Sequence, residues 1–246
     1  MNNKVVYQLM LSQSKNSNDP KTLLKELLEF DNFLYSKISS VAVKYGNGKH
    51  PKHRVTRYHD FFVDNVGCNE SVLDLGSGLG DVTYDVACKT NAEVVGIELN
   101  GQNVIEARKR YNEKRKNLIF THGDMKTGIS RAGSWRLDSS THFDIVIMSN
   151  VLEHMSNRVN LLKNIIKIIT PKKILFRIPY FEREWMIPIK KELEVKYFLD
   201  STHKIEYTYD EFYKEMKDAD LEVDFLKANW GEIWAVCIPT HKDLNE

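Results

Sequence analysis

A glycine-rich stretch, VLDLGSGLGDVT, follows an apolar run and could bind a ligand through its main chain. Gly76 and Gly78 can adopt positive φ angles and let a bound molecule touch the backbone. Asp74 lies just before them, and Glu98 ends the next apolar run about twenty residues after the glycines. A glycine turn followed at this distance by an acid is typical of sites that hold the two hydroxyls of a ribose.

The charges around the glycines favour one of the two ligand classes that share this pattern. A pyrophosphate is bound where a third glycine opens the following helix and the phosphates meet the helix N-terminus. This chain has Asp81 at that position, and Asp74 adds a second carboxylate. Two carboxylates repel a pyrophosphate and suit an ammonium and a sulfonium. The sequence therefore favours a sulfonium-bearing ligand over a dinucleotide.

Two histidines are candidates for proton transfer in such a site. His154 lies in NVLEHM, after a predicted strand, and His203 lies in DSTHKIEYTYDEF, before the last predicted helix. Methyl transfer from a sulfonium needs an aligned nucleophile, and a hydroxyl nucleophile must also lose its proton. A neutral imidazole can accept that proton near neutral pH. We therefore predict His154 and His203 as catalytic residues, although each could instead only pack or face solvent.

Short β-branched runs, separated mostly by helical patterns, must position these residues. The runs cover residues 72–75, 94–97, 118–120, 145–148 and 174–178. Strand–helix alternation of this kind predicts a parallel sheet covered on both faces. Ligands of such sheets bind beyond the carboxyl ends of the strands, where the glycines, Glu98 and His154 are expected.

Polar residues predict where the intervening helices begin and end. Asn100 is expected to cap a helix that runs to about residue 116. Ser156 is expected to cap another, which Pro171 stops. Thr208 and Glu211 form a capping box before the last helix.

The end of the chain departs from the alternation. The stretch LEVDFLKANWGEIWAVCIP predicts two strands joined tightly at residues 229–231. They must be antiparallel, because a parallel crossover needs a dozen or more residues. The sequence therefore predicts an α/β fold: a Rossmann-like, doubly wound, seven-stranded and mainly parallel sheet with an antiparallel last strand.

Composition narrows the choice of partners and compartment. The 246 residues include 35 basic and 34 acidic ones, so the chain lacks the basic stripe that a long nucleic acid needs. Three distant cysteines, Cys68, Cys88 and Cys237, suit free thiols in a reducing compartment. The first fifteen residues are too weakly apolar for a signal peptide or membrane span. We expect a cytoplasmic protein with a small-molecule substrate and no membrane contact; the oligomeric state is not indicated.

The motifs VLDLGSGLG, VVGIEL, THGDM and FDIVIMSNVLEHM resemble, in sequence and order, those of class I S-adenosylmethionine-dependent methyltransferases. The resemblance covers about residues 55–240, includes the antiparallel last strand and implies S-adenosyl-L-methionine as cofactor. It implies that Asp74, Gly76 and Gly78, with Ser77 between the glycines, line the methionine part. It further implies that Glu98 holds the ribose. The remaining implied contacts are Leu99 on the adenine, Asp124 at its amino group, Met125 against its ring, and Asn150 at the methionine end.

A second resemblance raises the question of a metal. Small-RNA 3′-end methyltransferases, and partly ubiquinone-pathway O-methyltransferases, bind a divalent ion through a Glu-x-x-Glu-His motif; the small-RNA enzymes add a later histidine. Glu153, His154 and His203 match, and KIEYT follows His203. Asn150, a weaker neutral ligand, replaces the first glutamate. A divalent metal is therefore a candidate cofactor but is not favoured.

The segments outside the motifs are expected to shape the site. In HPKHRVTRYHDFF, the spacing predicts Arg54 and Tyr58 on one helical face, and an arginine there would pair with the carboxylate of the cofactor or with an anionic substrate. Residues 21–45 also have helical spacing. We expect an N-terminal helical cap over residues 1–60 and a methyltransferase domain over residues 61–246. Substrate loops are expected at about residues 126–141 and 180–207.

These observations predict an O-methyltransferase that acts on a small polar metabolite, such as a sugar, a nucleotide-sugar or a phosphorylated intermediate. The alternative enzyme is a metal-assisted RNA 3′-terminal 2′-O-methyltransferase, which the Glu-His and later His residues suggest. A nicotinamide-dependent oxidoreductase is disfavoured by Asp81 and Asp124. A non-catalytic protein that only binds the cofactor remains open at this stage.

Overall fold

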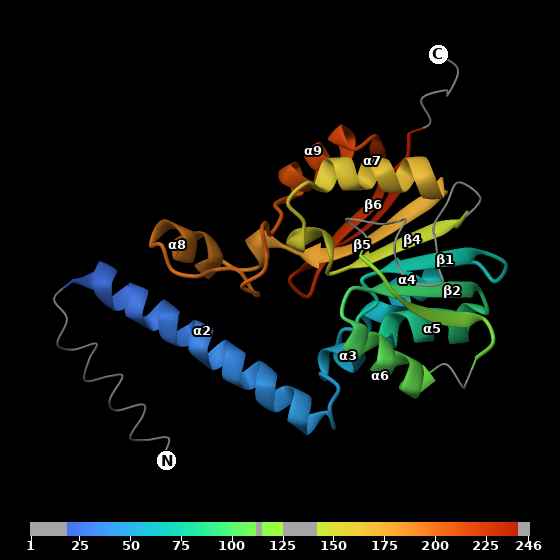
Figure 1. Cartoon of the computed structure of the whole chain (residues 1–246). Helices are drawn as coiled ribbons and strands as arrows, with labels where there is room; N and C mark the ends of the chain where they lie inside the picture. The colour runs from blue at the N-terminus through green and yellow to red at the C-terminus, as the bar shows by residue number, and fades with distance from the viewer. Residues whose placement is uncertain (1–18, 112–114, 125–141, 241–246) are drawn as a thin grey trace. The chain divides into compact units, whose positions relative to one another are not determined.

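The structure is a computed structural model that describes residues 19–111, 115–124 and 142–240. Within these residues the chain forms two compact units (Figure 1). The larger comprises the described parts of His53–Phe181 and Leu199–Glu246, and the smaller those of Met1–Lys52 and Glu182–Phe198. Every predicted site residue that the structure describes belongs to the larger unit.

The larger unit is built around a seven-stranded sheet with the order β3-β2-β1-β4-β5-β7-β6. The chain leaves β1 toward β2 and β3 and then returns to place β4 on the other side of β1, so the sheet has a switch point between β1 and β4, where ligands of such folds bind. The predicted fold class is confirmed. The strands are β1 (Ser71–Leu75), β2 (Glu93–Glu98), β3 (Leu118–His122), β4 (Ile145–Ser149), β5 (Lys173–Pro179), β6 (Leu221–Asn229) and β7 (Glu232–Pro239).

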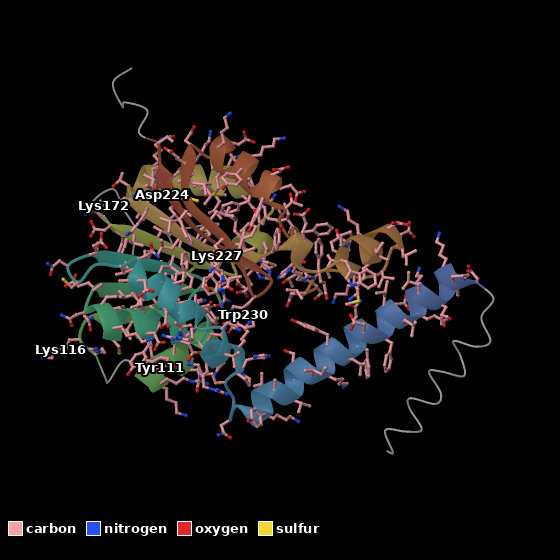
Figure 2. The ribbon with its side chains drawn as sticks, turned by 180° about the vertical axis from the view of Figure 1, so that it is seen from behind. Tyr111, Lys116, Lys172, Asp224, Lys227 and Trp230 are labelled. Atoms are coloured by element: carbon pink, nitrogen blue, oxygen red, sulfur yellow. The ribbon has the colours of Figure 1, made fainter. Side chains whose placement is uncertain are left out.

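The predicted antiparallel insertion is also confirmed, because β7 pairs antiparallel with both β5 and β6. Asn229 pairs with Glu232, and the two residues between them, Trp230 and Gly231, have φ of 54° and 76°. Two positive φ angles in a two-residue loop match the twist of a hairpin. Exposed charges on the edge strand β6, Asp224 and Lys227 among them (Figure 2), discourage pairing with another chain.

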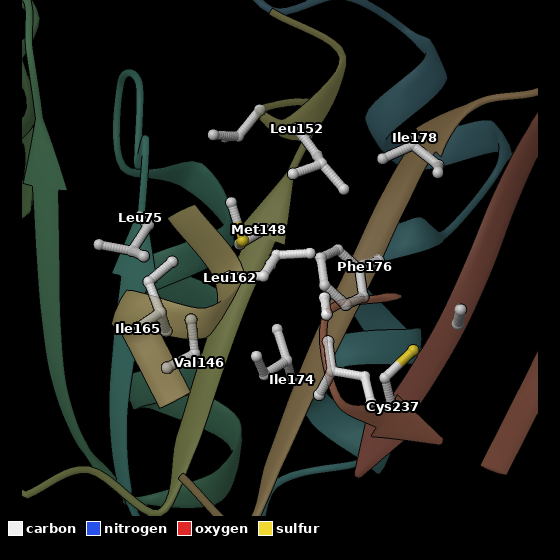
Figure 3. Close-up of a cluster of buried hydrophobic side chains, with 14 of the residues drawn as sticks. Leu75, Val146, Met148, Leu152, Leu162, Ile165, Ile174, Phe176, Ile178 and Cys237 are labelled. Atoms are coloured by element: carbon white, nitrogen blue, oxygen red, sulfur yellow. The ribbon is translucent and has the colours of Figure 1, made fainter. Parts of the chain in front are cut away.

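Helices cover both faces of the sheet (Figure 1). One face packs against α7 (Arg158–Ile169) and α9 (Tyr209–Asp218), and the other against α4 (Tyr58–Asp64), α5 (Asp81–Thr90) and α6 (Gly101–Tyr111). In the first layer, Leu162 and Ile165 of α7 gather with Met148 of β4 and Phe176 of β5 (Figure 3). Successive strand residues alternate between the two layers.

The predicted helix boundaries are partly correct. Thr208 and Glu211 form the predicted capping box at the start of α9. The predicted cap at Ser156 is wrong: Asn157 is the N-cap of α7, and its side chain makes no capping bond. Two adjacent polar residues gave no basis for choosing between them. The helix after Asn100 was predicted to run to about residue 116, whereas α6 is described over Gly101–Tyr111 and residue 116 lies in a turn.

The predicted single helical face with Arg54 and Tyr58 is wrong. The segment forms two short helices, α3 (Lys52–Val55) and α4, because Arg57 has φ of 53° and interrupts the helical ladder. Tyr58 is buried at the start of α4, whereas Arg54 is exposed.

The smaller unit contains α2 (Pro20–Tyr45), which confirms the predicted helix, and α8 (Met186–Glu192). Asp19 caps α2 by accepting the backbone N–H groups of Lys21 and Thr22. Leu28 packs against Leu193 and Val195. No helix in the described part of the chain is long and apolar enough to cross a lipid bilayer.

Candidate active site

The loop after β1 is held against the end of β2 by its own backbone. The N–H groups of Gly76 and Ser77 both donate to the carbonyl of Ile97, at 2.8 and 3.0 Å. The N–H of Gly78 donates to Oε2 of Glu98 at 2.9 Å, and the other oxygen of Glu98 accepts the N–H of Asn100 at 2.8 Å. The glycine loop and the predicted ribose-binding acid are therefore directly joined.

Gly76 and Gly78 provide a matched pair for testing this loop. Both have left-handed backbone angles, with φ of 79° and 56°. A Cβ on Gly76 would lie 2.5 Å from Cγ2 of Val151, whereas a Cβ on Gly78 would meet no described atom within 4 Å. We expect Gly76→Ala to lower the free energy of unfolding by about 2–5 kcal/mol and Gly78→Ala by about 1–2 kcal/mol. Urea unfolding measures both, and equal losses would contradict the steric explanation.

In and just before the glycine loop, two buried polar atoms have no hydrogen-bond partner among the described residues: Oδ1 of Asp74 and Oγ of Ser77. The other oxygen of Asp74 accepts the hydroxyl of Thr83 at 2.7 Å. Burial raises the pKa of Asp74 to about 7, and the nearby Glu98 adds to this shift, while the Thr83 hydrogen bond opposes it. Atoms of this kind fit a cationic ligand with hydrogen-bond donors.

The other predicted cofactor residues lie after neighbouring strands. Leu99, which follows β2, is 60% exposed and so presents the apolar surface expected under an adenine. Asp124 is half-buried after β3, and Met125 lies outside the described residues. Asn150 directly follows β4 with φ of 56°. The carboxyl edge of the sheet thus carries Asp74, Glu98, Asp124 and Asn150 on four adjacent strands.

The two predicted catalytic histidines lie side by side. The ring centroids of His154 and His203 are 4.8 Å apart. Nδ1 of His154 is 2.8 Å from Oγ1 of Thr202, and Nδ1 of His203 is 3.0 Å from Oε1 of Glu206. The sequence analysis named neither Thr202 nor Glu206 as a site residue, although both lie within three residues of His203. These bonds orient both rings and make Nε2 the nitrogen that each would offer to a ligand.

Local structure explains how residues far apart in the sequence meet here. His154 ends a short 3-10 helix, η2 (Leu152–His154), directly after β4. The loop that carries His203 is tied to η2, because the N–H of Lys204 donates to the carbonyl of Glu153 at 2.7 Å. Glu206 also accepts the N–H of Leu199 at 2.6 Å, which closes this loop on itself.

Glu153 completes a group that could hold a divalent ion. One ligand atom from each of Glu153, His154 and His203 lies within 4.8 Å of the others. Glu153 is fully buried, and neither carboxylate oxygen has a hydrogen-bond partner among the described residues. Burial is the main reason that the pKa of Glu153 rises to about 8, and the positive charge of Arg177 opposes this rise. One carboxylate and two oriented imidazoles are a donor set that divalent transition metals accept.

We expect Glu153→Gln to remove a pH-dependent loss of stability. The folded protein holds the Glu153 proton up to about pH 8, whereas the unfolded chain releases it near 4.5. Stability from this protonation is therefore complete below about pH 4.5 and is lost as the pH rises to about 8. In chelator, urea unfolding at pH 5 and pH 8 should show a smaller loss for the variant than for wild type.

Glu106→Gln, at a half-buried carboxylate on α6, is the control for this measurement. Its hydrogen bond with Arg110 lowers the pKa of Glu106, so this residue does not titrate between pH 5 and 8. Equal losses of stability for wild type and Glu153→Gln would contradict a protonated, buried Glu153.

Arg177 is a further residue at the site that the sequence analysis did not name. The residue is 4% exposed, and its guanidinium stacks on the ring of Tyr58, 3.6 Å from the centroid. Nε of Arg177 donates to Oδ1 of Asn150 at 2.9 Å, and Oε2 of Glu232 is 3.6 Å from the same nitrogen. An arginine inside a buried apolar strand, ILFRIP, is the signal that could have identified it.

The strand order, the inserted antiparallel strand, the glycine loop and the acid after β2 together define a class I S-adenosylmethionine-dependent methyltransferase. Residues 68–229 match a family model described as a methyltransferase domain, and the chain belongs to that family. The oxidoreductase and the non-catalytic alternatives are thereby set aside.

Two solved structures share the fold, and the names of the similar proteins differ in substrate. A Mycoplasma mobile protein described as an uncharacterized RNA methyltransferase is 32% identical over 113 residues, which is 45% of this chain and 28% of that protein. Magnesium protoporphyrin IX methyltransferase from Synechocystis PCC 6803, solved with bound SAH, has a TM-score of 0.60 and 14% identity over 89% of this chain and 99% of its own. The small RNA methyltransferase HEN1 has a TM-score of 0.59 and 15% identity over 78% of this chain and 26% of its own.

Proposed function

We propose that this protein is an O-methyltransferase whose acceptor is a small polar molecule, such as a sugar, a nucleotide-sugar or a phosphorylated intermediate. The observation that carries this proposal is the pair His154 and His203, oriented by Thr202 and Glu206 beside the end of β4. An oriented imidazole is the group that a hydroxyl acceptor requires and a more acidic nucleophile does not.

The cofactor would lie along the carboxyl edge of the sheet. The glycine loop would hold its methionine part. The contacts would come from the unpartnered side-chain oxygens of Asp74 and Ser77 and from the main chain at Gly76 and Gly78. Glu98 retains acceptor capacity for the ribose hydroxyls while its two backbone hydrogen bonds fix the carboxylate. The adenine would lie against Leu99, with Asp124 at its amino group and Met125 nearby.

S-adenosylmethionine supplies an activated methyl group and becomes a neutral thioether when an acceptor oxygen takes that group. His154 follows β4 closely and is the proposed general base, which receives the acceptor's hydroxyl proton on Nε2. Thr202 fixes the ring through Nδ1. His203, held by Glu206, orients the acceptor for that proton transfer.

Transfer of tritium from S-adenosylmethionine labelled in its methyl group tests the proposal. The acceptor panel contains phosphorylated sugars, nucleotide-sugars, amino acids and short RNAs. Base-stable labelling of a sugar or a nucleotide-sugar would support an O-methyltransferase of small polar acceptors. Labelling of amino acids alone, or of none although S-adenosylhomocysteine binds, would contradict it.

A second candidate, a metal-assisted RNA 3′-terminal 2′-O-methyltransferase, rests on the Glu153, His154 and His203 cluster. A divalent cation there would lower the pKa of a ribose hydroxyl. Asn150 would not be a metal ligand, because its Oδ1 accepts a hydrogen bond from Nε–H of Arg177. Methylation of a short RNA that stops in excess chelator and returns with Mn²⁺ or Mg²⁺ would favour this candidate. Full turnover on a sugar in the same chelator would exclude it.

A further inference from the structure

Arg177 has an unsatisfied donor in the interior of the site. Its Nη1 is buried and has no hydrogen-bond partner among the described residues. A guanidinium carries five N–H donors and cannot lose its proton, so a buried and unpaired Nη1 is costly unless an acceptor reaches it. A buried cationic donor left in this state is best explained by an anionic ligand group.

The neighbours of Arg177 hold the guanidinium in one position. Tyr58 covers its face, and Nε is committed to Asn150. Asn150 is fixed in turn, because its N–H donates to the carbonyl of Arg177 at 2.7 Å. Only the oxygen of the Asn150 amide can accept from Nε–H, so its NH₂ group faces away from the guanidinium as a further donor. Arg177 and Asn150 thus form one rigid group of donors.

The position of Arg177 places it beside the cofactor edge of the sheet. Arg177 alternates with Leu175 on β5 and Asp74 with Val72 on β1, so both side chains are on the α4–α6 face. Ser149 of β4, the residue before Asn150, pairs with Arg177. Only β4 separates β1 from β5 in the sheet, so Asp74 and Arg177 lie on the same face two strands apart.

A carboxylate and a cation on the same face of one sheet edge match a zwitterion. An anion alone would meet Glu232, whose Oε2 is 3.6 Å from Nε of Arg177, and Asp74 on the same face, whereas a cation alone would meet Arg177 itself. An α-amino acid carries both charges on one carbon. The methionine end of the cofactor has this form, with its ammonium suited to Asp74 and its carboxylate to the guanidinium.

We propose that Nη1 of Arg177 binds the α-carboxylate of the cofactor's methionine part, with Asn150 holding the guanidinium in position. The inference rests on the proposed function. It assigns to a residue of β5 the role that the sequence analysis gave to Arg54, which is exposed on α3.

Calorimetry with two ligands tests this assignment at pH 8. One ligand is S-adenosylhomocysteine, and the other is its decarboxylated analogue, which keeps the amine and the adenosine. Wild type is expected to bind S-adenosylhomocysteine roughly tenfold to hundredfold more tightly than the analogue, the effect of a charge-assisted hydrogen bond. Arg177→Met is expected to bind both with similar affinity. A general structural defect would weaken both ligands and leave the wild-type ratio unchanged.

Two further variants make the result interpretable. Arg158→Met removes an arginine whose ion pair with Glu215, at 2.8 Å, lies in the α7–α9 layer, and it is expected to keep the wild-type ratio. Arg177→Lys keeps the charge without the planar fork, so it is expected to keep only part of the wild-type ratio of affinities. This variant still tests the assignment if Arg177→Met does not fold. If both Arg177→Lys and Arg177→Met keep the wild-type ratio of the two affinities, the assignment to Arg177 is overturned. It is also overturned if wild type binds the two ligands equally well. Neither outcome by itself contradicts the proposed function. Failure of wild type to bind S-adenosylhomocysteine overturns the proposed function as well.

Discussion

Replacing both His154 and His203 by Ala is expected to lower kcat by about 100- to 10,000-fold, the range measured for the loss of a positioned acid or base. S-adenosylhomocysteine affinity is expected to stay at the wild-type value, because neither residue belongs to the proposed cofactor contacts. The two rings touch at 4.8 Å between centroids, so each single variant is expected to cost almost as much as the pair. Single-turnover methyl transfer with the identified acceptor, beside calorimetry with S-adenosylhomocysteine, measures both quantities.

The control for this experiment is His142→Ala. His142 is an exposed histidine before the amino end of β4, where it contacts the hydroxyl of Thr170. It lies at the edge of the sheet opposite the site, so turnover is expected to be unchanged. Wild-type turnover in the double histidine variant would remove both residues from the mechanism.

Chelator separates the two roles that these histidines can have. For a general base, wild type keeps its rate in excess chelator. For a metal site, chelator reproduces the loss seen in the double variant, and Glu153→Gln lowers the rate as well. The carboxyl of Glu153 has no part in the base mechanism, so under that mechanism Glu153→Gln is expected to retain most of the rate.

The sheet could be predicted because its determinants are local. Four of the five predicted runs before the hairpin have the four or five residues expected of a buried strand, and all five lie within one or two residues of the observed strands. The hairpin followed from two strands too close in sequence for a parallel crossover. The capping box at Thr208 and Glu211 also depends only on residues three apart.

The parts that could not be predicted depend on contacts between distant residues or on a single backbone angle. Nothing in the sequence indicates that Arg57 adopts φ of 53° and divides the basic segment into two helices. Glu206 orients His203 only because the loop folds back, with Tyr207 paired to Tyr180. Arg177 acquires its role from Tyr58 and Asn150, which precede it by more than a hundred residues and by twenty-seven residues. Spacing alone cannot reveal such partners.

Cofactor affinity is expected to fall as the pH drops below about 7, by up to tenfold per pH unit. The free protein holds a proton on Asp74 below this pH, because burial raises the pKa of Asp74 to about 7. The ammonium of S-adenosylhomocysteine is attracted to the carboxylate and not to the neutral acid. Binding at low pH must therefore displace the proton, and above about pH 7 this cost disappears.

Asp74→Asn shows whether Asp74 is the group responsible. The variant is expected to bind S-adenosylhomocysteine about 30-fold or more weakly at pH 8, from the loss of about 2–5 kcal/mol for one partner of a buried charge pair. Its affinity is expected to vary less with pH than that of wild type. Asp210→Asn, at an exposed position on α9, is the control that keeps the wild-type profile.

Calorimetry in buffers of different ionisation enthalpy counts the displaced proton directly. At pH 6, one unit below the pKa of Asp74, wild type is expected to release close to one proton when it binds the ligand. Asp74→Asn is expected to release about one proton fewer than wild type. The same affinity at pH 5.5 and pH 8 in wild type, with no proton released, would mean that the cofactor's ammonium does not face Asp74. The acidic residue before the glycine loop would then serve only the fold, through its bond with Thr83.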